Sequence, residues 1–401
     1  MTYEPQLVTL AKPSTTPAAS DASQASVSIG ASTSVGSSTS VGSSMSVGSS
    51  TSVGSSTLVG SSTSVGPATL VGQRLIDRFG RLHTSLRVSV TDRCNIRCFY
   101  CMPNENIQFR PREELLTFEE IERFVRVSAR LGVRKLRLTG GEPLVRRDVP
   151  ALVARLSAIA GIEEIALTTN GILLEEQAVA LKAAGLTRLN ISLDAMSEST
   201  FQKIARREGL DRVFAGIVAA RAAGFRRMRL NAVAIRGITE EEIVPLARYA
   251  REQECELRFI EFMPLDAEQR WDSSQVLTGE EIRRRLEAEF GPLREAPRPD
   301  PSQPACDYEF ADGVGGIGFI NPVSQPFCGD CNRLRITAEG QIRNCLFSTD
   351  EWDARALLRG GGDDEQLANL IVDCVAAKKA GHGIDSPEFI RPERSMYQIG
   401  G

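Results

Sequence analysis

Short strand-like runs alternate with longer helical stretches over residues 86–262, and this alternation constrains the fold more than any other feature of the chain. The runs are rich in leucine and β-branched residues and lie at 86–90, 135–139, 164–169, 188–193, 227–233 and 256–262. Helical periodicity is found between them, at 117–131, 149–160, 175–184, 198–223 and 240–253. Intervals of this length are typical of parallel crossovers rather than hairpins. The sequence therefore predicts an α/β fold, with either a doubly wound sheet or a barrel-like sheet.

Polar motifs follow the predicted strands at their carboxyl ends. TDRC follows the first strand, TGGEP the second and TTNG the third, while SLD ends the fourth and EFMP follows the sixth. Alone, TGGEP or TTNG is typical of a simple turn. Because ligands of such sheets gather at the carboxyl ends of the strands, the repeated placement predicts a ligand site at this edge. Four of the predicted helices are followed by a glycine that is expected to cap them: Gly132, Gly161, Gly185 and Gly224.

Three cysteines in the segment CNIRCFYC stand just after the first predicted strand. Cys94, Cys98 and Cys101 have the spacing C-x3-C-x2-C, with Tyr100 before the last one. Three thiolates can hold three irons of a 4Fe–4S cluster and leave the fourth iron open to a ligand, whereas cluster sites with four cysteines have no such vacancy. A zinc site or three buried thiols is the alternative, but structural zinc sites favour four ligands and the chain has only two histidines. We therefore expect an iron–sulfur cluster at this triplet.

A second set of three cysteines lies near the C-terminus. Cys328, Cys331 and Cys345 have the spacing C-x2-C-x13-C. Taken alone, this spacing also fits half of a zinc ribbon. Beside the first triplet, a second three-ligand 4Fe–4S cluster is the better interpretation. The other cysteines, Cys255, Cys306 and Cys374, have no spacing partner, although Cys306 is near enough in sequence to be a candidate fourth ligand.

The beginning of the chain differs in composition from the rest. From Gly30 to Gly66 a six-residue unit, SSTSVG, repeats with small variations. Such a segment cannot bury enough apolar surface to offset its chain entropy. A hexapeptide β-helix is the alternative, but the larger apolar residues that fill such a core are missing. Residues 1–74 are therefore expected to form a disordered, low-complexity tail.

Charge and composition argue against several classes of function. The net charge is −4 at pH 7, and outside the tail acidic and basic residues are nearly balanced. Nothing in this balance indicates a nucleic-acid or membrane surface. No stretch approaches the ~20 apolar residues that span a bilayer, and the tail lacks the marks of a transit or secretion signal. Nine cysteines with iron–sulfur spacing are typical of a reducing compartment, which predicts a cytoplasmic protein.

The two triplets, the TGGEP turn, NRLR after Cys331 and the terminal IGG together resemble a known family. From about Leu86 to the C-terminus, the chain resembles the GTP 3′,8-cyclases (molybdenum cofactor biosynthesis protein A) of the radical S-adenosylmethionine superfamily. Several families of that superfamily share the first triplet, whereas the second triplet with NRLR and a terminal Gly-Gly is much narrower. The resemblance implies an incomplete six-unit (β/α) TIM-like barrel over residues 75–295. A C-terminal region, 296–401, would close its open side and carry the second cluster, the GTP site and the Gly-Gly tail.

The resemblance also implies a reaction. One 4Fe–4S cluster would cleave S-adenosylmethionine reductively, and the resulting 5′-deoxyadenosyl radical would take a hydrogen from the ribose 3′ carbon of GTP. Attack on carbon 8 of the guanine and reduction would give (8S)-3′,8-cyclo-7,8-dihydroguanosine 5′-triphosphate, in the first step of molybdenum cofactor biosynthesis. The second 4Fe–4S cluster would hold the guanine through its open iron.

Specific residues inherit roles from this resemblance. Cys94, Cys98 and Cys101 would hold the first cluster, and Cys328, Cys331 and Cys345 the second. The residues that match contacts to S-adenosylmethionine are Tyr100, Gly141, Ser192 and Met263. A glycine in the TGGEP turn lets the backbone approach the methionine amine, since a Cβ would block it. Without the resemblance, Met263 would be interpreted as ordinary core packing.

The triphosphate of GTP has to be held by side chains, because the sequence has no G-x4-G-K-[ST] loop. Arginine offers a fork of donors that matches phosphate oxygens, although with forty-one arginines and six lysines most arginines here have no specific role. The residues that match GTP contacts of the family are Arg87, Arg137, Thr168, Arg333 and Arg335. Arg258 is a further candidate because it lies on a predicted strand. Arg229 stands where the family usually has lysine, and its bulkier fork would alter the phosphate contact.

Gly400 and Gly401 end the chain and, taken alone, indicate only a frayed terminus. In the family this Gly-Gly tail inserts toward the active site and is needed for cyclisation, which predicts a catalytic role. Glycine suits this task because it adopts backbone conformations that other residues avoid.

The resemblance finally implies partners. They are a flavodoxin- or ferredoxin-type reductant, the downstream cyclic pyranopterin monophosphate synthase and a second copy in a homodimer, with no nucleic acid and no membrane. Two rival hypotheses are another two-cluster radical enzyme that modifies a peptide, and a non-catalytic zinc- or redox-binding protein.

Overall fold

One twelve-stranded sheet organises the part of the chain that the computed structural model describes, which comprises residues 74–265, 270–384, 386, 387 and 389–400. Six strands follow one another in sequence order and are parallel: β1 (Ser85–Ser89), β2 (Lys135–Thr139), β3 (Glu164–Thr169), β4 (Arg188–Ser192), β5 (Met228–Ala234) and β6 (Glu256–Glu261). Their bounds agree with the sequence prediction to within one residue. The prediction of an α/β fold with a parallel sheet is therefore confirmed.

C-terminal residues extend this sheet at both of its edges. β10 (Arg333–Ile336) pairs in parallel with β1, and β9 (Gly316–Ile320) pairs in parallel with β6. Antiparallel strands follow outside them: β11 (Gln341–Arg343) and β12 (Trp352–Asp353) beyond β10, and β8 (Cys306–Phe310) and β7 (Leu293–Glu295) beyond β9. Among the described residues the two outermost strands, β12 and β7, do not pair with one another, so the sheet is open. Because β10 contains most of the NRLR segment and pairs with β1, this segment lies beside the strand that leads to the first cysteine triplet.

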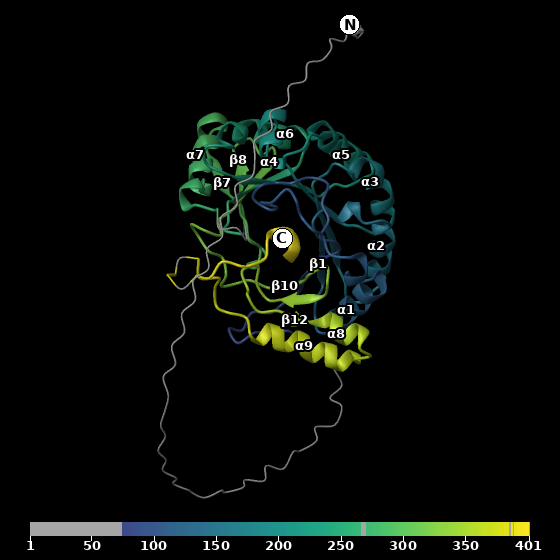
Figure 1. Ribbon diagram of the computed structural model, residues 1–401. Coiled ribbons are helices and arrows are strands. Elements are labelled where there is room, and N and C mark those ends of the chain that lie inside the picture. Colours follow the sequence, from purple (N-terminus) through teal and green to yellow (C-terminus); the bar gives the residue numbers. More distant parts are fainter. Residues whose placement is uncertain (1–73, 266–269, 385, 388, 401) are drawn as a thin grey trace, which may run out of the picture. The chain divides into compact units, whose positions relative to one another are not determined.

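Helices cover the outside of the strands (Figure 1). The crossovers contain α1 (Phe118–Arg130), α2 (Val149–Ser157), α3 (Leu174–Ala183), α4 (Glu198–Ala205), α5 (Leu210–Ala222) and α6 (Ile243–Glu252). The C-terminal region adds α7 (Gly279–Phe290), α8 (Ala354–Arg359), α9 (Asp364–Ala376) and α10 (Met396–Ile399). Short 3-10 turns lie at Arg112–Glu114, Pro143–Val145, Glu240–Glu242 and Ser273–Gln275. α10, near the end of the chain, lies close to the strands in Figure 1, which brings the C-terminal segment to the site described below.

Local sequence signals set the helix ends. The Thr117 side chain accepts a hydrogen bond from the Glu120 backbone N–H, and the Glu120 side chain accepts one from Thr117, so a capping box begins α1. The four glycines expected to cap helices, Gly132, Gly161, Gly185 and Gly224, all have a positive φ, which confirms that prediction. Phe124 and Val127 of α1 are fully buried against the sheet. Burial of side chains of this size stabilises the fold by about 1.5–3 kcal/mol each.

The single helix predicted over 198–223 is wrong in one respect, because two helices, α4 and α5, occupy this range. Arg206 adopts a left-handed conformation with φ of 53° and ends α4. The carbonyls of Ile204 and Ala205 then accept hydrogen bonds from the backbone N–H groups of Phe99 and Arg97, at 3.1 and 2.9 Å. A continuous helix would use these carbonyls internally. The break therefore ties the first cysteine segment to the fold.

The described residues belong to one compact unit. Residues 1–73 lie outside the described part, so the predicted disordered tail, 1–74, falls outside it except for residue 74. Within that part no helix is both long and apolar enough to cross a membrane.

Candidate active site

The first cysteine triplet lies in the loop that follows β1 and lines one pocket. Cys94, Cys98 and Cys101 share this pocket, whose empty volume is about 660 Å³, with the TGGEP turn and with residues at the ends of β3 and β4. The backbone N–H groups of Cys101 and Met102 donate to the Cys98 carbonyl at 3.0 and 2.8 Å, which makes the loop compact. None of the three thiols forms a disulfide. The structure therefore brings the three predicted ligands to one place.

Burial and nearby carboxylates make these three thiols hard to ionise. Burial raises the pKa of Cys94 to about 11, and the carboxylate of Glu142 adds to the shift. Burial also raises the pKa of Cys98 well above its usual range, with Asp194 as the next cause, and burial raises the pKa of Cys101. Such thiols ionise only when a cationic centre compensates their charge. Among the described residues no three His, Cys, Asp or Glu side chains are arranged to hold a single metal ion. The all-thiol donor set and the shared pocket instead fit a cluster.

Gly141 in the TGGEP turn packs directly against the cysteine segment. Its N–H donates to the Thr91 carbonyl at 2.7 Å, and the Glu142 N–H donates to the Arg93 carbonyl at the same distance. A Cβ at Gly141 would lie 2.3 Å from the Arg93 carbonyl oxygen. The need for glycine therefore has a structural cause besides the predicted approach to a ligand.

The other residues predicted to contact S-adenosylmethionine lie at the boundary between this pocket and a larger chamber. Tyr100 and Ser192 line both cavities, whereas Met263 lines only the chamber. The Tyr100 hydroxyl donates to Asp194 Oδ2 at 2.7 Å, and Asp194 Oδ1 accepts from the Val233 N–H at 2.8 Å. Asp194 thus fixes the tyrosine ring at the boundary.

The second cysteine triplet lines the chamber, whose empty volume is about 1390 Å³. The Arg333 guanidinium contacts Cys331 Sγ through Nε and Nη2 at 3.3 and 3.2 Å, and Lys378 Nζ lies 3.4 Å from the same sulfur. Burial opposes ionisation of this thiol, but the two cations prevail and lower the pKa of Cys331 to about 6. Burial raises the pKa of Cys328.

Three arginines form a row on adjacent strands beside this triplet. Arg335 of β10 pairs in register with Arg87 of β1, which pairs in register with Arg137 of β2, and all three line the chamber. Within the described residues their side chains form no hydrogen bond or ion pair with the protein, and Nε and Nη1 of Arg335 are fully buried. Burial and the neighbouring arginines lower the pKa of Arg137 to about 9 and that of Arg335 to about 10. Burial lowers the pKa of Arg87 in the same way. Uncompensated cations in such a row indicate a site for an anion.

The remaining predicted substrate residues are placed differently. Thr168 and Arg333 line the chamber. Arg258 lines it too, while its Nε donates to Glu256 at 2.6 Å. Arg229 is not among the lining residues, and its Nε donates to Glu256 Oε2 at 2.7 Å. Arg229 is thus held in an ion pair with the next strand.

The C-terminal segment reaches both cavities. Met396, the first residue of α10, lines the first pocket and the chamber. The Thr139 hydroxyl donates to the Gly400 carbonyl at 3.4 Å, and a Cβ at Gly400 would lie 2.9 Å from Ser89 Cβ. With φ of 69°, Gly400 also has a backbone conformation that favours glycine. Gly401 lies outside the described residues.

Sequence reasoning missed several residues of the site. Asn190, Asn231, Asn344 and Met396 line the chamber, and Lys378 contacts Cys331. For Asn190 the sequence did carry a signal, because this polar residue stands between Leu189 and Ile191 in a predicted strand. The structure shows that it is buried. No comparable signal marked Lys378, which follows α9 far from the cysteines in sequence. Cys306, the candidate fourth ligand, lines neither cavity.

Comparison with known proteins identifies two family models in the chain. The Radical SAM superfamily model matches residues 88–250, and the Molybdenum Cofactor Synthesis C model matches residues 255–384. A relative from Rhodopirellula baltica, named GTP 3′,8-cyclase, is 54% identical over 330 residues, which covers 82% of this chain and 92% of that protein. A protein of the same name from Paenarthrobacter nicotinovorans is 45% identical over 344 residues, with 82% of this chain and 97% of that protein covered.

Solved structures share the fold at low sequence identity. The structure of Streptococcus suis SuiB bound to S-adenosylmethionine has a TM-score of 0.53 and 14% identity, and the match covers 73% of this chain and 68% of that one. At this identity the likeness shows the fold alone.

Proposed function

The chain belongs to the GTP 3′,8-cyclase family of the radical S-adenosylmethionine superfamily, and from this premise we propose that it converts GTP to (8S)-3′,8-cyclo-7,8-dihydroguanosine 5′-triphosphate. Two 4Fe–4S clusters and S-adenosylmethionine are the cofactors of this reaction. The observation that carries the proposal is a row of arginines with no partner among the described residues. They line a chamber that has one cysteine triplet at its wall, and the other triplet lines the adjoining pocket.

We infer that the sheet wraps around this chamber as a partial barrel. Side chains from β1, β2, β3, β4, β5, β6 and β10 all line the same cavity. Strands so far apart in the sheet order can share one cavity only if the sheet curves strongly. A curved sheet holds substrate and cofactor on one inner face and excludes bulk water from them.

The triphosphate would lie against Arg87, Arg137 and Arg335. Their forks match phosphate oxygens, and an anionic ligand would compensate charges that the described protein groups leave unpaired. Thr168 would add a hydroxyl contact, and Arg333 would contact the nucleotide near the second triplet. Arg229 would reach a phosphate only by leaving Glu256, so we propose a weaker contribution for it.

The guanine would lie toward Cys328, Cys331 and Cys345, where the second cluster would offer its open iron. S-adenosylmethionine would lie in the first pocket, near Gly141 and between Tyr100 and Ser192, with Met263 on the chamber side. When bound, the first cluster supplies the electron that cleaves this cofactor. Tyr100, held by Asp194, would keep the cofactor's ribose end directed at the chamber.

The C-terminal glycines would close the site. Gly400 sits against Ser89 and Thr139 where only a glycine fits without a shift, and Met396 forms part of the wall between pocket and chamber. A reactive primary carbon radical needs such enclosure, because otherwise it reacts with other nearby C–H bonds. We propose that Gly400 and Gly401 complete this enclosure.

We also propose the partners and setting that the family implies. A flavodoxin- or ferredoxin-type protein would supply electrons, cyclic pyranopterin monophosphate synthase would consume the product, and the chain would act in the cytoplasm as a homodimer. The boundary between the barrel region, 75–295, and the C-terminal region, 296–401, is likewise a proposal.

The test is an anaerobic assay of the reconstituted protein with GTP, S-adenosylmethionine and a reductant. We expect the cyclised nucleotide and one 5′-deoxyadenosine per turnover, identified by mass spectrometry. Unchanged GTP together with uncoupled release of 5′-deoxyadenosine would contradict the substrate assignment and reopen the peptide-modifying alternative. Stoichiometric zinc without iron would instead support the non-catalytic alternative.

A further inference from the structure

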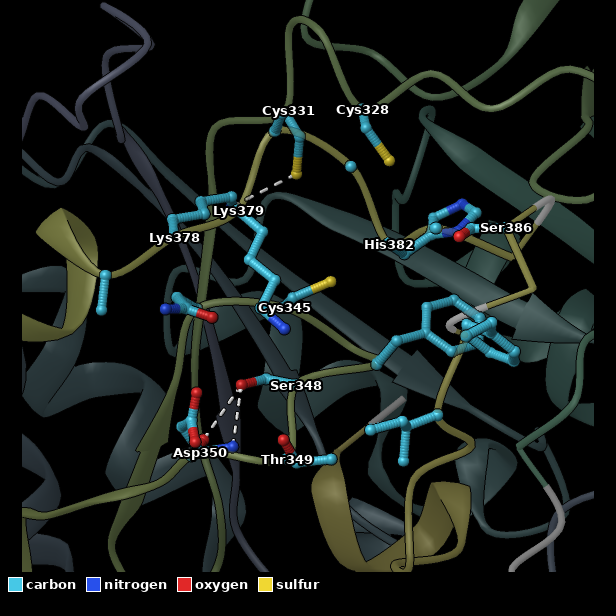
Figure 2. Close-up of a pocket in the computed structure, with 18 of the residues that line it drawn as sticks. Cys328, Cys331, Cys345, Ser348, Thr349, Asp350, Lys378, Lys379, His382 and Ser386 are labelled. Carbon is cyan, nitrogen blue, oxygen red and sulfur yellow. Dashed lines mark hydrogen bonds between the residues drawn. The ribbon is translucent and has the colours of Figure 1, made fainter.

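Lys378 is a buried cation beside the second cysteine triplet. The residue follows α9, its side chain is 3% exposed, and its Nζ donates to the Arg333 carbonyl at 2.8 Å. Its other contact is the Cys331 sulfur at 3.4 Å, drawn as a dashed line in Figure 2. Within the described part of the chain no carboxylate pairs with this ammonium. Burial of a lysine ammonium beside a sulfur is costly unless that sulfur carries a negative charge.

The lysine approaches the triplet from an outer hollow and not from the chamber. Cys328, Cys331 and Cys345 line both the chamber and an outer hollow with an empty volume of about 960 Å³ (Figure 2). Lys378 lines only the outer hollow, whereas Arg333 lines only the chamber. The two cations therefore reach the same sulfur from different cavities, Lys378 from the outer hollow and Arg333 from the chamber. A change at Lys378 alters the surroundings of the triplet without altering the chamber wall.

Arg81 fixes the segment that carries this lysine. Its Nη1 donates to the Cys328 and Ala380 carbonyls at 2.7 and 2.8 Å, and its Nη2 donates to the Lys379 carbonyl at 2.6 Å. Asp77 pairs with Arg81 at 2.6 Å and balances its charge. The segment after α9 is thus tied to the cysteine loop by a neutral pair. Among the described residues of this hollow, the ammonium of Lys378 is left as a buried charge with no carboxylate partner, whereas the neighbouring Lys379 is exposed.

We propose that Lys378 is a positioning residue for the second cluster, which orients the Cys331 sulfur and makes the cluster easier to reduce. The inference rests on the proposed function because it requires a second cluster. A cluster gains one negative charge on reduction, so a fixed cation beside a ligating sulfur favours the reduced form. Hydrogen bonds to ligating sulfurs and nearby charge are among the determinants of cluster potentials.

The experiment is a redox titration of the second cluster by electron paramagnetic resonance in Lys378→Met. The reconstituted full chain is titrated without GTP, and again in a Cys94→Ser background that removes one ligand of the first cluster. We expect reduction to become about tenfold less favourable, which is about 59 mV lower for a one-electron couple. Lys378→Arg should stay close to the wild type. The matched control is Lys379→Met, which removes the neighbouring exposed lysine of the same hollow and should leave the potential unchanged.

The outcomes separate charge from packing. If the second cluster of Lys378→Met has an unchanged reduction potential, the inference is overturned and the proposed function is unaffected. The proposed function is tested separately, by whether the wild type cyclises GTP. If Lys378→Met binds no second cluster, Lys378→Gln and Lys378→Arg decide. Recovery of cluster and potential by arginine but not by glutamine supports the inference. If Lys378→Gln and Lys378→Arg both lose the second cluster, or if both keep it with equal reduction potentials, the inference is contradicted.

Discussion

The two cysteine triplets lie in adjoining cavities, yet the balance of charged groups around them differs, because carboxylates and Arg97 lie beside the first and two cations contact the second. Beside the first triplet are the carboxylates of Glu142 and Asp194, and burial with Glu142 raises the pKa of Cys94 to about 11. Beside the second are Arg333 and Lys378, which lower the pKa of Cys331 to about 6 against the effect of burial. Both sets have three cysteines, although their spacings differ. Their surroundings differ as well, and this favours different ligands.

The difference matches the charges of the two proposed ligands. S-adenosylmethionine carries a sulfonium cation, and it would bind on the side where carboxylates predominate. GTP is a polyanion, and it would bind beside the second triplet at Arg87, Arg137 and Arg335, which have no partner among the described residues. Electrostatic complementarity of this kind sorts ligands between neighbouring sites. We therefore propose that neighbouring charged side chains, and not the cysteines themselves, determine which ligand each triplet takes.

The largest expected effect comes from removing one ligand at each site. Cys94→Ser should abolish cleavage of S-adenosylmethionine, because the first cluster loses a thiolate. Cys328→Ser should retain some cleavage and lose cyclisation, because it leaves the first triplet intact. Release of 5′-deoxyadenosine and formation of the cyclised nucleotide are measured in the same anaerobic reaction. Full cyclisation by Cys328→Ser would show that the second triplet is not needed for cyclisation.

Thiol reactivity of the cluster-free, reduced protein should differ between Cys331 and Cys94 by about a hundredfold at pH 7. The fraction of thiolate differs by about 10⁴-fold, and the lower nucleophilicity of the less basic thiolate offsets about half of these decades. Iodoacetamide followed by peptide mass spectrometry should label Cys331 well before Cys94. Cys331 is the more buried of the two, so its faster reaction could not come from exposure. Equal labelling rates would show that Arg333 and Lys378 do not act on this sulfur.

The same shifts give opposite pH dependences of stability in the cluster-free protein. The pKa of Cys331 is lowered to about 6 from 9.0, so its contribution is complete above pH 9 and is lost as the pH falls through 6. The pKa of Cys94 is raised to about 11 from 9.0, so its contribution is complete below pH 9 and is lost as the pH rises through 11. Urea unfolding at a series of pH values measures both. In Cys331→Ala the free energy of unfolding should depend less on pH between 6 and 9, and its decrease between pH 9 and 11 should be unchanged.

Arg87→Met should weaken GTP binding and stabilise the free protein at the same time. Loss of a charged hydrogen bond to phosphate should raise the Kd for GTP about tenfold or more. Removal of a cation that has no partner among the described residues should raise the free energy of unfolding by about 1 kcal/mol. Calorimetry with GTP and thermal unfolding without it measure the two effects.

The matched control for Arg87 is Arg229→Met. Because Arg229 pairs with Glu256 and does not line the chamber, its loss should lower stability and change the Kd for GTP less. An equal loss of GTP affinity in both variants would show that Arg229 moves to the phosphate on binding.

The smallest expected effect separates the backbone packing of the two sites. Gly141→Ala should cost about 1–3 kcal/mol of stability, because its Cβ would lie 2.3 Å from the Arg93 carbonyl oxygen. Gly329→Ala, between Cys328 and Cys331, should change stability by less than about 0.5 kcal/mol, since nothing lies within 4 Å of the added Cβ. Thermal unfolding of both variants tests this. A similar cost at both positions would contradict the contrast.

Much of the fold could be predicted because its periodic signals are local. Strand bounds and the glycine caps follow from residue patterns within each α/β unit, whereas these patterns left the order of the strands open between a doubly wound and a barrel-like sheet. The break between α4 and α5 could not be predicted in this way. It depends on hydrogen bonds from Arg97 and Phe99, about a hundred residues away, to the carbonyls of Ala205 and Ile204.

The candidate site divides along the same line. Motifs next to strands gave the six cysteines, and family resemblance gave the arginines, of which the structure gathers Arg87, Arg137, Arg333 and Arg335 around one chamber. The pairing of Arg229 with Glu256 and the contact of Lys378 with Cys331 needed three-dimensional information. Side-chain partners on separate elements leave no periodic pattern in a sequence. The charge difference between the two triplets was therefore invisible until the structure was known.

The most direct test of the account is electron paramagnetic resonance of the anaerobically reconstituted chain in three forms, namely wild type, Cys94→Ser and Cys328→Ser. We predict that the cluster left in Cys94→Ser changes its signal with GTP and not with S-adenosylmethionine, and that the cluster left in Cys328→Ser does the reverse. A single cluster in the wild type, or signals that respond alike to both ligands, would contradict the claim that the two triplets hold separate clusters for oppositely charged ligands.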